Sequence, residues 1–139
     1  SLVGSEMCIR DRSERDRYQF GTFLQLETET KARLRPFLVK HGLDLDESQG
    51  GAEAVAGFVA LYQEHDWSDF LTQLRPVIDQ FLGRFREIAA IGPEEDKAIL
   101  DSMVLHEESF VHWIEKELAG ESGGLDAALS QIENPLPVP

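Results

Sequence analysis

The stretch that decides the fold is LDSMVLHEESFVHWIEKELAG, residues 100–120. At about 100° of rotation per residue, its apolar side chains gather on one face of a helix; they are Leu100, Met103, Phe110, Val111, Ile114 and Leu118. Gly92 and Pro93 precede this pattern and Gly120 comes after it, which is typical of helix ends. We therefore predict a helix from about Pro93 to Leu118.

One acidic side chain, Glu107, lies near the centre of this apolar face. An isolated buried charge is very costly, so such a carboxylate must be neutralised, paired or bound to something. Glu27 holds the same kind of position on the first predicted helix. Two buried carboxylates on two helices predict a site between those helices.

The rest of the chain also has helical patterning. We predict helices over residues 18–41 and 52–65, a third from Asp66 to Ile91 with Asp66 and Asp69 forming its cap, and a short fifth helix over 125–132. The predicted apolar face of the first helix contains Phe20, Phe23, Leu24, Leu34, Phe37 and Leu38. No alternating strand pattern is found, so the sequence predicts an all-α, antiparallel four-helix bundle with a short fifth C-terminal helix.

The first residues differ in character from the rest of the chain. SLVGSEMCIRDR, residues 1–12, resembles the translated sequencing-adaptor string that recurs at the ends of reading frames assembled from environmental DNA. It contains Cys8, the one cysteine of the chain, so no intrachain disulfide is expected. We interpret 1–17 as a disordered or artefactual leader, 18–132 as one domain and 133–139 as a proline-rich tail.

The charge of the chain excludes some partners. The 139 residues carry a net charge of −13, and residues 18–139 hold nine Lys or Arg against 22 Asp or Glu. A nucleic-acid surface needs a basic footprint, and an anionic membrane surface disfavours an acidic protein, so we expect neither partner. No apolar run is long enough to span a membrane, and a cytosolic location is the expectation.

The candidate chemistry centres on Glu107, with a pKa raised by an apolar setting, as a general acid or base. His106, on the side of Trp113, and Lys31, near the face edge, would orient it, and Glu27 would complement it. In this hypothesis the carboxylates line a pocket for a small apolar metabolite. The alternative is a non-catalytic, homodimeric interaction module in which Glu107 pairs with Lys31, or bonds to Tyr62 or Trp67, and fixes helix register.

The segment HEESFVHWIEKEL, residues 106–118, resembles the rubrerythrin style of the Glu-x-x-His motif found in ferritin-like bundles. This resemblance covers the first and last long helices and implies a ferritin-like fold, with Glu27 at the place of a lone ligand. The motif is incomplete, because Phe110 stands three residues after Glu107, and His112 stands four after Glu108. We therefore expect no metal and no cofactor, and keep a metal-binding bundle as a second alternative.

Overall fold

The computed structural model describes residues 14–43 and 51–139, and every regular element in these two ranges is a helix. The elements are α2 (Glu14–Lys40), α3 (Gly51–Glu64), α4 (Trp67–Ile91), the 3₁₀-helix η1 (Glu94–Asp96), α5 (Lys97–Leu118) and α6 (Asp126–Leu129). The all-α prediction is confirmed for this part of the chain. Residues 1–12, which carry the predicted adaptor string and Cys8, lie outside it.

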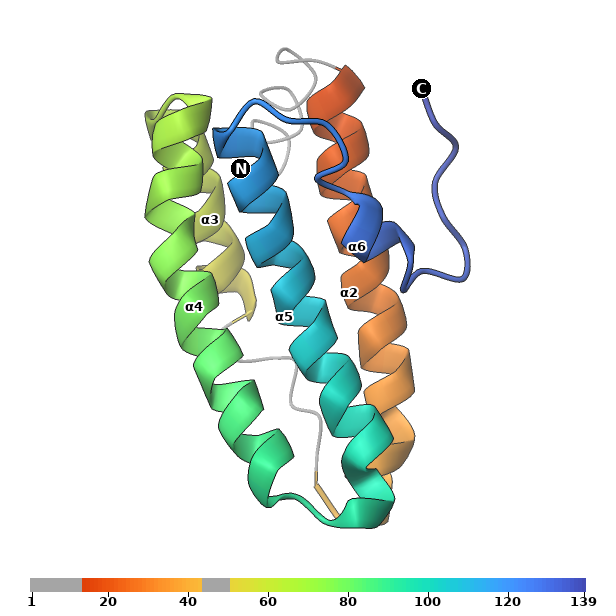
Figure 1. Cartoon of the computed structure of the whole chain (residues 1–139). Helices are drawn as coiled ribbons and strands as arrows, with labels where there is room; N and C mark the ends of the chain where they lie inside the picture. The colour runs from red at the N-terminus through yellow and green to blue at the C-terminus, as the bar shows by residue number, and fades with distance from the viewer. Residues whose placement is uncertain (1–13, 44–50) are drawn as a thin grey trace.

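Helix α5 is the centre of the arrangement. It lies between α2 and α4 and contacts both, while α6 packs on α5 and α2 (Figure 1). The shorter α3 packs on α4, with Phe58 and Tyr62 against the ring of Phe70 near the start of α4. The far half of α4 therefore extends beyond α3. None of the helices described is long and apolar enough to cross a membrane.

The helix ends agree closely with the predicted signals. The Asp66 carboxylate accepts a hydrogen bond from the Asp69 backbone N–H at 2.8 Å, which confirms this cap. Gly92 ends α4 in an extended conformation, and a 3₁₀ turn, rather than an α-helix, comes after Pro93. The bounds of two helices differ from the predicted ones. Helix α2 begins at Glu14 instead of residue 18, and α6 has four residues, Asp126–Leu129, where a helix over 125–132 was predicted.

The buried face of α2 is not the one that apolar periodicity predicted. Leu24 is 69% exposed, whereas Leu26 is fully buried, and Gln19, Thr22 and Thr30 are buried with it. At 100° per residue this face is rotated by about 80° from the predicted one. Polar partners on α5 explain the rotation, because Trp113 Nε1 donates to Gln19 Oε1 at 2.9 Å and Thr30 bonds to His106.

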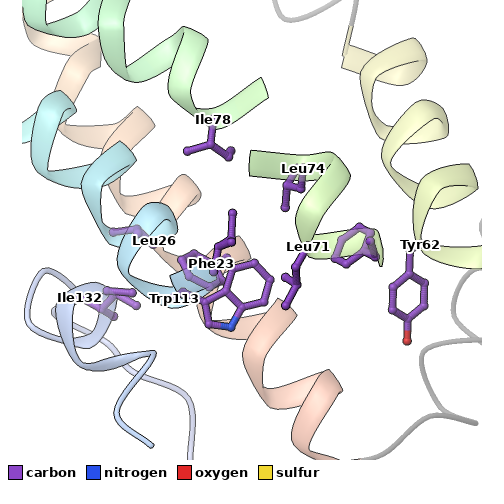
Figure 2. Packing of buried hydrophobic residues seen from close by; sticks show 11 residues of the cluster. Phe23, Leu26, Tyr62, Leu71, Leu74, Ile78, Trp113 and Ile132 are labelled. Carbon is purple, nitrogen blue, oxygen red and sulfur yellow. The ribbon is translucent and has the colours of Figure 1, made fainter. Parts of the chain in front are cut away.

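The core is rich in aromatic rings and lies where α2, α3, α4 and α5 meet. Trp113 is 1% exposed and lies beside Phe23 and Leu71 (Figure 2). Phe23 also stacks on Phe110 with centroids 4.3 Å apart. Offset and edge-to-face ring pairs of this kind add to the stability that apolar burial provides. The core thus fixes α5 against its neighbours and holds the next turns of α5 and α2 in register.

Two polar clusters tie the outer segments to this core. At the far end of α2, Lys40 Nζ and His41 Nε2 contact the buried Asp96 carboxylate, each at 2.9 Å. The hydrogen bond from Lys40 and then that from His41 lower the pKa of Asp96. Along α2, the Glu29 carboxylate accepts a bond from the Glu133 backbone N–H at 2.7 Å, which holds residues after α6 against α2.

Candidate functional site

A cleft of about 90 Å³ lies between α2, α4 and α5. It is lined by Glu27, Thr30, Lys31, Leu34, Phe85, Met103, His106 and Glu107. All four residues that the sequence hypothesis singled out therefore line one cleft. Thr30 and Phe85 were missed, Thr30 because it lies off the predicted apolar face and Phe85 because the site hypothesis did not include the predicted helix from Asp66 to Ile91.

Glu107 lies on the inner wall of the cleft. The residue is 8% exposed, and its Oε2 atom is buried without a hydrogen-bond partner. Burial raises the pKa of Glu107 from the usual 4.5 to about 7; the charge of Glu27 adds to this rise and that of His106 opposes it. Near neutral pH, Glu107 therefore exists in both its acid and its carboxylate forms.

His106 links two helices across the cleft. It is 4% exposed, with Nε2 3.0 Å from Glu27 Oε2 and Nδ1 2.9 Å from Thr30 Oγ1. The hydrogen bond from His106 is the main reason that the pKa of Glu27 is lowered, so this carboxylate acts as an acceptor. The hydrogen-bond network therefore assigns the proton of a neutral His106 ring to Nε2, with Nδ1 accepting from the Thr30 hydroxyl.

Arg33 adds a further donor to this chain of hydrogen bonds, at Thr30. Its Nη2 atom donates to Thr30 Oγ1 at 3.1 Å, and its Nη1 atom donates to the Gln131 carbonyl, also at 3.1 Å. Because Thr30 Oγ1 accepts from Arg33, its own proton is free to point at His106. The donors thus run in one direction, Arg33 to Thr30 to His106 to Glu27, and fix the imidazole ring.

Three details of the sequence hypothesis need correction. Glu27 is not buried, because its side chain is 47% exposed at the mouth of the cleft. Lys31 is exposed, and the basic side chain that contacts the Glu107 carboxyl group in the described part of the chain is His106, at 3.8 Å, not Lys31. His106 is not a boundary residue beside Trp113, since it is buried and its ring packs on Phe110.

Glu108 and His112, the two residues of the incomplete Glu-x-x-His pattern, are not among the residues that line the cleft. Glu108 lies partly exposed and bonds to Arg86 at 3.2 Å, whereas His112 contacts the Gly123 carbonyl at 3.2 Å. Within residues 14–43 and 51–139, no group of three or more His, Cys, Asp or Glu side chains has a geometry that would hold a metal ion.

No protein-family model matches the chain, and the comparisons with curated proteins and with solved structures found no match. The chemistry of the cleft therefore has to be inferred from its geometry. The cleft combines a carboxyl group that changes protonation near pH 7 with an imidazole held in a single orientation. Apolar side chains from Leu34, Phe85 and Met103 complete the walls. Such a site is suited to exchange a proton with a small bound group.

Proposed function

We propose that the cleft at Glu107 binds one end of a small apolar metabolite and transfers a proton to or from it. The observation that carries this proposal is the buried, unpartnered Oε2 atom of Glu107 in the wall of a cleft. Buried polar atoms are nearly always hydrogen-bonded, so an unpartnered carboxylate oxygen on a residue that lines a cleft marks a position for a ligand group.

The size of the cleft limits what enters it. Ligand pockets usually measure about 300–1,000 Å³, and one water occupies about 30 Å³ in the liquid. A volume of about 90 Å³ therefore takes only a few heavy atoms. The polar end of the metabolite would lie at Glu107, and its remaining part would lie outside, near the exposed side chains of Glu27 and Lys31.

Each residue has a role in this proposal. Glu107 donates its proton to an oxygen of the ligand in its acid form and removes one in its carboxylate form. His106, oriented by Thr30, is the positioning residue that holds Glu27 at the mouth. Lys31 supplies a positive charge beside Glu27, and this charge contributes to the lowered pKa of Glu27.

The frame that we infer for this site is an antiparallel four-helix bundle with one short member, α3. Successive helices of the chain are joined by short turns at Asp66 and at Gly92–Pro93, which favours antiparallel neighbours. Because α3 is about half as long as α4, the wall beside Phe85 is left without a covering helix. This would account for a cleft in that half of the molecule.

Ligand-observed NMR with small carbonyl, hydroxyl and amide fragments tests the proposal. We expect fragments to bind the parent protein with a pH dependence centred near 7, set by the Glu107 carboxyl group. Glu107→Gln should abolish that dependence, whereas Glu108→Gln, the same change at the next and partly exposed residue, should preserve it. Equal binding to the parent and to Glu107→Gln at every pH would overturn the proposal.

A second candidate function, a homodimeric interaction module, is favoured by the outer surface of α4. Val77, Phe81 and Ile88 are each 45% exposed, and Ile91 is 85% exposed. Their spacing of four, seven and three residues places them on one face, which is how coiled-coil seams are built. Helix α4 also carries three arginines against three acidic residues, in a chain whose net charge of −13 would otherwise repel a second copy.

Light scattering after size-exclusion chromatography tests this second candidate. If α4 pairs with a second copy, the parent should have the mass of a dimer, and Ile88→Gln should shift it toward the monomer. Leu105→Gln is the matched control, because Leu105 is 51% exposed but lies on α5. A monomeric parent at high protein concentration would exclude the dimer.

A further inference from the structure

A second and larger pocket lies at the C-terminal end of α5, away from the Glu107 cleft. Its volume is about 290 Å³, and its walls include Arg15, Tyr18, Trp113, Glu117, Glu121 and Asp126. It is enclosed by the start of α2, the last turns of α5 and the loop that leads into α6. This volume approaches that of ordinary small-molecule sites.

Glu117 is the buried acidic group of this pocket. Its side chain is 6% exposed, and Oε2 is paired with the guanidinium group of Arg15. The other oxygen, Oε1, is buried and has no hydrogen-bond partner. An ionised carboxylate oxygen can only accept, so this atom is an acceptor that still lacks an N–H or O–H donor.

The charges around the pocket leave room for one further positive charge. Arg15 pairs with Glu117, and Lys116 pairs with Glu121 at 2.7 Å. Asp126 remains as a third carboxylate in the wall, against these two basic residues. Among the residues that the structure describes here, the local balance is therefore one negative charge, which a monovalent cation would neutralise.

The loop and the aromatic walls favour an organic cation over a bare ion. Gly123 has a φ of +85°, and a Cβ atom there would lie 2.9 Å from Asp126 Oδ2, so glycine lets Asp126 fold back toward the loop. The side chains of Tyr18 and Trp113 form part of the walls, and aromatic rings attract cations. The indole N–H of Trp113 already donates to Gln19, and Glu117 Oε1 remains a buried acceptor without a donor in this wall.

We propose that this pocket binds a small organic cation that carries N–H groups, either a primary amine or a guanidinium compound, whose head group donates to Glu117 Oε1. The N–H requirement separates this proposal from simple charge attraction. It also makes no use of the Glu107 cleft, so each proposal can fail without the other.

The test monitors the indole N–H resonance of Trp113 by NMR during titration at constant ionic strength. We expect n-butylamine and methylguanidine to shift this resonance in a saturable way, and a difference between them identifies the preferred head group. Tetramethylammonium, a cation without N–H groups, and n-butanol, a neutral analogue, should bind much more weakly. Equal shifts from tetramethylammonium would overturn the proposal.

Two variants and one control complete the experiment. Glu117→Gln should weaken binding by about tenfold or more, since a hydrogen bond to a charged group is lost. Asp126→Asn, at an exposed position, should weaken binding of the cation by a smaller factor. This variant tests the proposal if Glu117→Gln does not fold. Glu115→Gln makes the same charge change on α5 at an exposed residue outside the pocket and should bind like the parent. Parent-like binding by both Glu117→Gln and Asp126→Asn would overturn the proposal.

Discussion

The buried carboxyl group of Glu107 has a direct consequence for stability. Its folded pKa of about 7 is above the usual 4.5, so the folded state binds more protons than the unfolded state between these two values. Stability from this residue is therefore complete below about pH 4.5 and is lost as the pH rises through about 7. The ionised carboxylate is the form that burial penalises.

We expect Glu107→Gln to match the parent near pH 4 and to be more stable at pH 8, by up to about 3 kcal/mol. Glutamine keeps the shape of the protonated acid and cannot ionise. Urea unfolding of both proteins across this pH range measures the difference. A variant that is less stable than the parent at pH 8 would show that the Glu107 carboxylate is held by a favourable partner.

Thr30 is the second residue whose role can be measured. It is 6% exposed, and its hydroxyl group joins Arg33 to His106. We expect Thr30→Val, which keeps the shape and removes the hydroxyl, to lower the free energy of unfolding by about 1–3 kcal/mol, because it leaves Nδ1 of His106 buried without a donor.

The control for Thr30→Val is Thr28→Val on the same helix. Thr28 is exposed, and its hydroxyl donates to the backbone carbonyl of Leu24 at 2.9 Å. Urea unfolding should find Thr28→Val close to the parent. If both substitutions have the same effect, the bond from Thr30 to His106 contributes nothing to stability.

At the scale of single helices, α2 shows how far apolar periodicity can be trusted. The existence and the ends of α4 were predictable, because Asp66 and Gly92 act locally on the backbone. The buried face of α2 was not, since Gln19 and Thr30 are buried only because Trp113 and His106 lie opposite them. No pattern within α2 carries that information.

The site was predictable to the same extent. Glu107 could be found, because a charged residue within an apolar face of its own helix is visible in the sequence. The part played by Thr30 and the exposure of Glu27 could not, since both depend on the rotation of α2 against α5. Phe85 reaches the cleft from α4, and only the three-dimensional packing brings it there.

The rotation of α2 gives a paired prediction. Leu26→Ala should destabilise the protein by about 2–5 kcal/mol, since Leu26 is fully buried and its removal leaves a cavity. Leu24→Ala, two residues away and at a 69% exposed position, should change stability by less than about 0.5 kcal/mol. Thermal unfolding monitored by circular dichroism compares the two. If Leu24→Ala destabilises the protein more than Leu26→Ala does, the buried face of α2 is the one predicted from periodicity.

At the scale of the whole molecule, the ferritin-like resemblance is tested by metal content. The motif in residues 106–118 lacks a histidine three positions after Glu107, where Phe110 stands. We expect the purified protein to contain no stoichiometric iron, manganese or zinc. Elemental analysis that finds about two metal ions per chain would contradict this and favour the metal-binding bundle.

The central position of α5 has a consequence for the exchange of backbone amide hydrogens with solvent. Exchange from α5 requires separation from both α2 and α4, whereas α3 can open by leaving α4 and the aromatic cluster around Phe70. Amides in the middle of α5 should therefore exchange only through global unfolding, and those of α3 through a smaller local opening. Native-state hydrogen exchange would then show α3 as the first segment to lose protection and α5 as the last.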